Sequence, residues 1–189
     1  MAIQVAWIGE GPEPHSLVTA VVRVVHREFG LPAARLKIED RPPPAALTFD
    51  ARRGQHASRA VLGWLDARRP SEGTKVLGIT DVDLFIPVLT FVFGEAQLGG
   101  ALAVVSLARL REPASEALLR GRLLKEAVHE LGHTFGLVHC ASMACVMARS
   151  PGLGAVDRKD DQLCPDCRSR YRDLMEPWYV ADRHPHSDR

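Results

Sequence analysis

Three histidines and a glutamate stand close together in the segment VHELGHTFGLVHC, residues 128–140. His129 and His133 are four residues apart, so on a helix they lie about 40° apart around the axis, one turn from each other. Two imidazoles placed in this way can bind one zinc ion. Glu130 points about 100° away from His129, which places its carboxylate beside a water on that ion and not on the ion itself. The spacing therefore predicts a zinc site with its own general base.

A third ligand is predicted just after the helix. Gly136 can end the helix with a sharp turn, because a residue without Cβ adopts a left-handed conformation at low cost. His139 then returns toward the ion, which gives three imidazoles and one open position, the pattern of catalytic zinc. The alternative is that His129 and His133 are core histidines and Glu130 is a surface carboxylate. Three histidines and a glycine at these offsets argue against that alternative.

All four cysteines follow in one short stretch: Cys140, Cys145, Cys164 and Cys167. Four thiolates suit a closed structural zinc site, and such a clip would order residues 147–163, which carry few secondary-structure signals. Two disulfides and a redox-active CxxC are the alternatives. We favour a metal because clustered cysteines in a reducing compartment are typical of metal sites, and because Cys164 lacks a strand-to-helix context. Met147 either lies under the histidines as an apolar base or fills space in the core.

Hydrophobic periodicity predicts the elements that position these residues. Buried strands are expected at 3–8, 35–38 and 75–80, amphipathic helices at 16–29 and 55–68, a hairpin at 91–96 and 101–107, and a long helix at 115–137. Strands that alternate with helices imply a mostly parallel sheet, to which the hairpin adds one antiparallel edge. We therefore expect an α/β fold with a single compact domain and a mixed sheet of about five strands. Helices pack on the sheet, and a zinc-clipped C-terminal loop region follows the active-site helix.

The expected edge strand is itself a candidate binding site. An extended peptide can pair with an open sheet edge, main chain to main chain. The candidate substrate-binding residues are therefore Phe91, Val92, Phe93, Gly94, Glu95 and Ala96.

Length and charge limit the class of protein. The chain has 189 residues, of which 46% are hydrophobic, and this is enough for one compact core. Basic and acidic residues number 24 and 23, and no polybasic stretch predicts a nucleic-acid partner. No apolar run is long enough to cross a bilayer, and the first residues lack a signal-peptide pattern. We expect a cytoplasmic monomer without a membrane partner.

The motifs together resemble the signature of the archaemetzincins, a branch of the metzincin zinc peptidases. The residues that carry the resemblance are HELGHTFGLVHC, then Cys145-Val146-Met147, then CPDC at 164–167. VLGITDVDLFIP, FVFGEA and AVVSLARLR upstream also look similar, so the likeness covers roughly residues 76–167. The stretch 148–163 is one residue shorter than is usual in that family.

The resemblance implies a metzincin-like zinc metallopeptidase that hydrolyses peptides or proteins. It implies two zinc ions, a catalytic one bound by His129, His133 and His139 and a structural one bound by the four cysteines. Glu130 would activate the zinc-bound water as general base and acid, and Met147 would form the Met-turn. The alternatives are a zinc-stabilised binding module with little or no peptidase activity, and a zinc hydrolase or deaminase acting on a smaller substrate.

The single catalytic domain would then have three parts. Residues 1–138 form the sheet and its helices, including the active-site helix. Residues 139–180 contain the Met-turn and the four-cysteine region. Residues 181–189, with His184 and His186, are expected to be a disordered tail.

Overall fold

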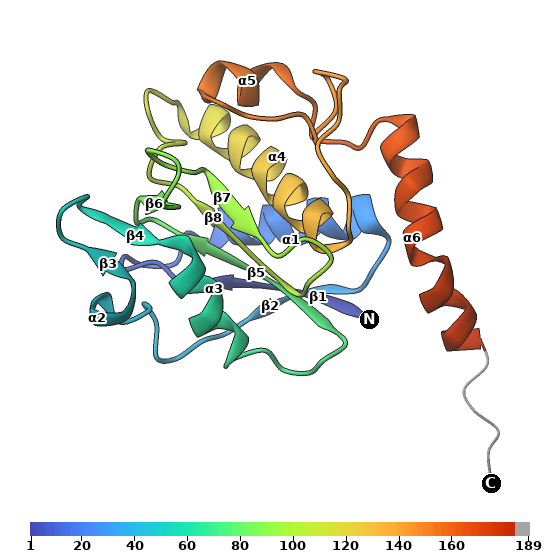
Figure 1. The fold of residues 1–189 in the computed structure, drawn as a ribbon, viewed down its shortest axis with the longest axis horizontal. Coiled ribbons are helices and arrows are strands. Elements are labelled where there is room, and N and C mark those ends of the chain that lie inside the picture. Colours follow the sequence, from blue (N-terminus) through green and yellow to red (C-terminus); the bar gives the residue numbers. More distant parts are fainter. Residues whose placement is uncertain (184–189) are drawn as a thin grey trace, which may run out of the picture.

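The computed structural model describes residues 1–183, with side chains described as far as residue 178. A five-stranded sheet in the order β2-β1-β5-β8-β7 forms its centre (Figure 1). The strands are β1 (Ala2–Trp7), β2 (Ala33–Leu36), β5 (Thr74–Thr80), β7 (Gly94–Ala96) and β8 (Leu102–Ser106). The first four in spatial order run parallel, and β7 pairs antiparallel with β8 at one edge. The predicted mixed α/β sheet with one antiparallel edge strand is confirmed.

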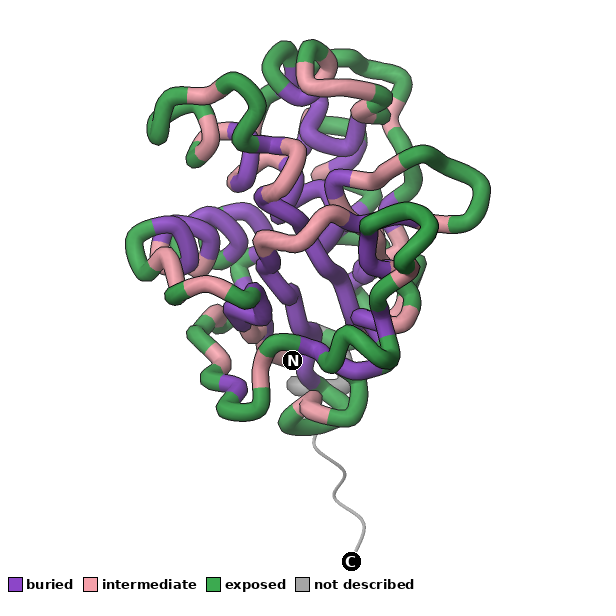
Figure 2. The backbone as a smooth tube through the Cα atoms, turned by 90° about the vertical axis from the view of Figure 1, so that its left-hand side faces the viewer, coloured by how far each residue is buried: buried purple, intermediate pink, exposed green. Residues whose placement is uncertain are grey.

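Helices cover both faces of this sheet. α1 (His15–Phe29) and α4 (Glu116–Thr134) pack on one face, and α3 (Ser58–Asp66) packs on the other. The remaining described helices are α2 (Ala45–Thr48), α5 (Leu153–Arg158) and α6 (Pro165–Arg183). Side chains alternate along each strand, so Val5 packs in the core shared with α1 and α4, whereas Ala6 packs in the core shared with α3. Figure 2 shows the buried residues gathered along the sheet and the helix faces that cover it. Strands β5 and β8 are buried along their whole length, as parallel strands covered on both faces are.

Several predicted boundaries were wrong. Residues 55–57 form strand β4 (Gln55–Ala57) and not the first turn of a helix, because they pair with β6 (Leu84–Phe85) and with β3 (Phe49–Asp50) in a second, three-stranded sheet. The predicted strand 35–38 lies two residues earlier, at β2. Of the predicted edge strand 91–96, only β7 joins the ladder, and Val92 forms an isolated bridge with Leu84 instead.

The C-terminal region also contains more helix than the sequence analysis expected. α5 lies within residues 147–163, and α6 begins inside the CxxC. Cys167, Tyr171 and Met175 of α6 recur every four residues and are buried in the main core. The Tyr171 hydroxyl donates a hydrogen bond of 2.7 Å to the carbonyl of Phe29, which attaches α6 to the end of α1.

The predicted tail 181–189 is described in part. Its first three residues belong to α6, and the rest, with His184 and His186, lie outside the described residues. None of the described helices is long and apolar enough to cross a membrane.

Candidate active site

Helix α4 carries the predicted ligands, and both of its ends are fixed. At the start, the Ser115 hydroxyl accepts a hydrogen bond of 3.2 Å from the N–H of Leu118. At the end, Gly136 has a φ of +90°, and its N–H donates to the carbonyl of His133 at 2.9 Å. The N–H of Leu137 donates to the carbonyl of Gly132 at 3.1 Å, which completes a Schellman motif. The chain therefore turns sharply at the glycine that the sequence analysis singled out.

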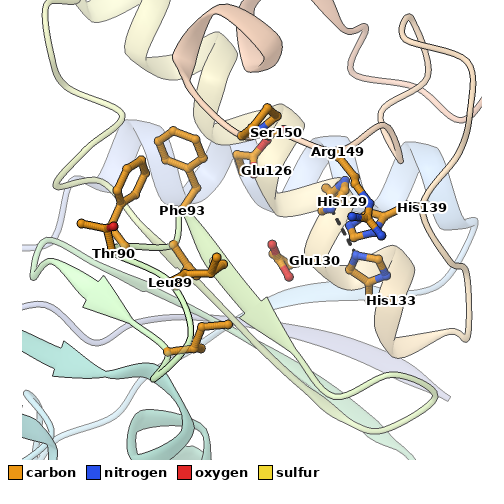
Figure 3. A pocket seen from close by; sticks show the side chains of 15 residues that line it. Leu89, Thr90, Phe93, Glu126, His129, Glu130, His133, His139, Arg149 and Ser150 are labelled. Carbon is orange, nitrogen blue, oxygen red and sulfur yellow. Dashed lines mark hydrogen bonds between the residues drawn. The ribbon is translucent and has the colours of Figure 1, made fainter.

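The three histidines of the motif come together beside α4. Nδ1 of His129 lies 2.8 Å from the carbonyl oxygen of Val146, and Nδ1 of His133 lies 2.7 Å from that of Leu137. Because a carbonyl only accepts hydrogen bonds, both Nδ1 atoms carry the proton and both Nε2 atoms keep a lone pair. Those two Nε2 atoms are 3.1 Å apart, and the His139 ring stacks over His129 with its centroid 5.3 Å away (Figure 3).

This geometry fits a zinc ion. Two nitrogens at the usual bond length from a tetrahedral zinc are about 3.3 Å apart, close to the observed separation. Ligand atoms of His129, His133 and His139 all lie within 4.8 Å of one another. Burial lowers the pKa of all three imidazoles below the ordinary histidine value, so the neutral form that binds metal is favoured. The Nε2 lone pairs of His129 and His133 face each other with no proton between them, so they repel each other. A cation between them would remove this repulsion.

Glu130 lies next to the histidines and is buried. Burial raises the pKa of its carboxyl group well above the ordinary value; the Glu126 charge adds to this effect, and the Lys159 charge opposes it. Strand β7 passes directly over Glu130 at Gly94, where an added Cβ would lie 2.7 Å from Cγ of Glu130 and 2.6 Å from the carbonyl oxygen of Val104. Only a glycine fits between the strand and the glutamate.

A buried ion pair that the sequence analysis missed lies on the other side of His129. Nζ of Lys159 is 2.7 Å from Oε1 of Glu126, and the two side chains are 0% and 3% exposed. The ammonium group also donates to Oγ of Ser150 at 2.8 Å, and it lies 3.4 Å from Nδ1 of His129. Oγ of Ser150 donates to Oε1 of Glu126 at 3.1 Å. The network ties the segment after Met147 to α4 beside the predicted metal ligands.

Met147 lies under the helix that carries the histidines. It is fully buried, and a Cβ added to Gly132 would lie 2.5 Å from its sulfur atom. The carbonyl of Met147 accepts a hydrogen bond of 2.9 Å from the N–H of Cys140. Cys140 and Ala148 form an isolated bridge, which joins the two ends of this loop. Met147 therefore packs against α4 at Gly132 and is part of the main core.

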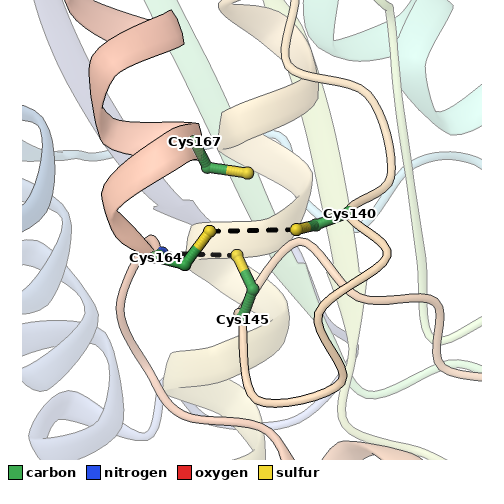
Figure 4. A group of neighbouring side chains, drawn as sticks. All are labelled: Cys140, Cys145, Cys164 and Cys167. Carbon is green, nitrogen blue, oxygen red and sulfur yellow. Dashed lines mark hydrogen bonds between the residues drawn. The ribbon is translucent and has the colours of Figure 1, made fainter.

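The four cysteines also come together, about the N-terminus of α6 (Figure 4). All four are free thiols, and Sγ of Cys140 lies 3.8 Å from Sγ of Cys164, far beyond a disulfide bond length of about 2.05 Å. Two sulfurs on one tetrahedral zinc are about 3.8 Å apart, so the separation fits a metal. Sγ of Cys145 accepts from the N–H groups of Met147 and Cys164, and the N–H of Cys167 lowers the pKa of the Cys164 thiol. These contacts favour the thiolate form of Cys145 and Cys164, whereas burial raises the pKa of the Cys145 and Cys167 thiols. A bound cation would offset that cost of burial.

A hollow of about 530 Å³ opens over the histidines and Glu130. Predicted substrate-binding residues line it at 91–94, whereas the Glu95 side chain accepts a hydrogen bond from Ser58 on the other side of the strand. Ala96 lies further along β7. The sequence analysis missed the remaining lining residues, which are Ile86, Leu89, Thr90, Glu126, Arg149, Ser150 and Pro151. No local pattern marked them, since they come from three separate segments.

Comparisons with known proteins identify the family and the fold of the chain. The chain matches the model of peptidase family M54 over residues 18–173. The archaemetzincin of Methanopyrus kandleri is 42% identical over 163 residues, which are 86% of this chain and 90% of that protein. A crystal structure of archaemetzincin from M. kandleri has a TM-score of 0.80 at 36% identity and covers 93% of this chain and 96% of its own. A crystal structure of archaemetzincin from Archaeoglobus fulgidus, complexed with malonate, has a TM-score of 0.76 at 33% identity. The match covers 90% of this chain and 99% of that one.

The α/β fold and the histidine and cysteine groups, together with these relatives, define a zinc metallopeptidase. The chain belongs to peptidase family M54, the archaemetzincins, and the resemblance noted in the sequence is confirmed.

Proposed function

We propose that the chain hydrolyses peptide bonds at a catalytic zinc held by His129, His133 and His139, with Glu130 as general base. The observation that carries this proposal is the pair of Nε2 lone pairs that face each other at 3.1 Å beside a buried carboxylate. A second, structural zinc is held by Cys140, Cys145, Cys164 and Cys167. Four thiolates would leave that ion no open position, so the chemistry would belong to the histidine site.

Zinc held by the three histidines would supply Lewis acidity to polarise the scissile carbonyl and to lower the pKa of the attacking water. Glu130 takes the proton from that water and later delivers it to the leaving amine. The buried setting supports this double role, because burial raises the pKa of the Glu130 carboxyl group well above its ordinary value and so makes the carboxylate a stronger proton acceptor. The carbonyls of Val146 and Leu137 hold the two helix imidazoles in the tautomer that leaves Nε2 free.

The substrate main chain lies antiparallel to β7. In the β7–β8 ladder the N–H of Ser106 donates to the carbonyl of Phe93, and the N–H of Gln97 donates to the carbonyl of Leu102. Residues 93, 95 and 97 therefore face β8, and the main-chain groups of Gly94 and Ala96 point away from the sheet. An extended peptide can pair with these groups, which brings its scissile bond over Glu130. Phe91, Val92 and Phe93 then contact the substrate's side chains.

The test is cleavage of a library of unstructured peptides by the zinc-loaded chain and by Glu130→Ala. We expect the variant to keep its zinc and lose activity by about a hundredfold or more, because the proton acceptor is gone. Glu116→Ala, at an exposed glutamate in the first turn of α4, is the matched control and should remain active. A hydroxamate should block the parent. Equal hydrolysis by Glu130→Ala would contradict the mechanism, and a parent that binds peptides without cutting them would favour the binding-module alternative.

A further inference from the structure

A second hollow lies next to the first at His139, and no residue of β7 lines it. It measures about 510 Å³, and its lining includes His139, Arg149, Pro151 and Arg158 together with the exposed Met143. His139, Arg149 and Pro151 line both hollows, so the two hollows adjoin at the third histidine. In Figure 3 Arg149 lies beside His139 at the rim of the first hollow. A substrate bound over Glu130 and long enough to pass His139 would reach the second hollow.

The charged residues that line the second hollow are all positive. Two arginines line it, and no aspartate or glutamate does. Within residues 1–178, the guanidinium groups of Arg149 and Arg158 take part in no hydrogen bond and no ion pair, whereas nearby Arg122 is paired with Asp157 at 2.7 Å. Two unpaired cations at one concave surface leave an unbalanced positive potential.

We propose that this basic hollow, lined by Arg149 and Arg158, binds a carboxylate of the peptide substrate. The inference rests on the proposed peptidase function and adds a substrate class to it: peptides that carry an acidic side chain or a free C-terminal carboxylate near the cleaved bond. The guanidinium group presents a planar fork of N–H donors that matches a carboxylate, and such charge-assisted hydrogen bonds are stronger than neutral ones. Arg149 adjoins His139, so a carboxylate held there also fixes the position of the scissile bond relative to Glu130.

The experiment uses the zinc-loaded full chain and matched peptides derived from one that it cleaves. The first kind of pair compares Glu with Gln at the residue next to the scissile bond, and it is made once for each side of that bond. The second kind compares a free C-terminus with an amidated one. Cleavage is measured as kcat/KM for the parent, Arg149→Gln and Arg158→Gln. Arg120→Gln, at an exposed arginine in the first half of α4, is the control. Binding of the same peptides, fluorescently labelled, to zinc-loaded Glu130→Gln is measured by anisotropy.

The parent should prefer the charged member of at least one pair about tenfold or more, mainly through KM. Arg149→Gln should bring that preference close to one, and Arg120→Gln should keep it. A preference for Glu over Gln alone identifies a side-chain carboxylate, and a preference for the free C-terminus alone identifies the terminal one. Equal cleavage of charged and neutral peptides by the parent overturns the proposal.

The binding measurement separates this proposal from the proposed function. If the parent cuts no peptide in the library, the pairs are built on the library peptide that Glu130→Gln binds most tightly. Tighter binding of charged peptides, lost when Arg149→Gln is added, then supports the basic hollow while the peptidase function fails. Equal binding of charged and neutral peptides, or no binding of either, overturns the carboxylate site whether or not cleavage occurs.

Discussion

His139 and Cys140 are consecutive residues that belong to two different groups of ligand atoms. The His139 imidazole lies with the other two histidines, and Sγ of Cys140 lies with the other three thiols. The arrangement recurs a few residues later, because the carbonyl of Val146, which accepts from His129, directly follows Cys145. The histidine and cysteine groups are therefore joined through single peptide units. A substitution in one group should change the geometry and the metal affinity of the other.

The first prediction follows from this connection. Cys164→Ser should release zinc from the cysteine group and also weaken zinc binding at the histidines by about tenfold or more, because His139 and the Val146 carbonyl lose their support. Competition with a chelator measures the affinity of the remaining ion. Met143→Ser, at an exposed position in the same loop, should leave both affinities unchanged. A histidine site of normal affinity in folded Cys164→Ser would show that the two groups are independent.

The second prediction concerns the close approach of Gly132 to Met147. An alanine at 132 places Cβ 2.5 Å from the methionine sulfur, so Gly132→Ala should lower the free energy of unfolding by about 1–3 kcal/mol. Gly121→Ala is the matched control on the same helix, since nothing lies within 4 Å of its Cβ. There the gain in helix propensity should stabilise the protein by up to about 1 kcal/mol. Urea unfolding of both variants measures the difference, and equal stabilities would contradict the packing.

The third prediction concerns the buried pair of Lys159 and Glu126. Lys159→Met leaves a buried carboxylate without its partner and should cost about 3–5 kcal/mol of stability. Adding Glu126→Gln should recover a large part of that loss, because the uncompensated charge is removed. A double-mutant cycle by urea unfolding gives the coupling energy. If the two losses simply add, the pair does not interact as the structure shows.

The fourth prediction concerns Lys75 at the start of β5. Its Nζ donates to the carbonyls of Gly100 and Thr134, both at 2.8 Å, and so holds the end of α4. Burial, helped by the charge of Arg69, lowers its pKa to about 8. Between that value and the ordinary pKa of about 10.4, the unfolded chain binds a proton that the folded chain does not. Stability attributable to Lys75 therefore rises with pH over this window and is constant below it.

Unfolding free energies of the parent and Lys75→Met between pH 7 and pH 10.5 check this sign. The parent should gain relative to the variant as pH rises above about 8. If the parent instead loses stability relative to Lys75→Met over the same pH range, the folded protein holds the Lys75 proton more tightly than the unfolded chain does, and the prediction is wrong.

The sequence predicts this site better than it predicts the surrounding fold, and the reason is physical. The offsets of His129, His133 and Gly136 are set by helix geometry alone, so a local pattern contains them. Strand β4 forms because residues 55–57 pair with residues 84 and 85, and a local window does not contain that pairing. The same holds for Lys159 and Glu126, which lie far apart in the chain. Helix α6 is different, because Cys167, Tyr171 and Met175 recur every four residues and form a local helical pattern that the sequence does contain.

In the proposed mechanism the histidine group alone is catalytic, and the cysteine group is structural. Zinc content and peptide hydrolysis, measured on the same preparations of the parent and His133→Ala, test it most directly. The parent should contain about two zinc ions and hydrolyse peptides, and the variant should contain about one, stay folded and be inactive. A variant that keeps both ions, or that hydrolyses peptides with one, would contradict the account.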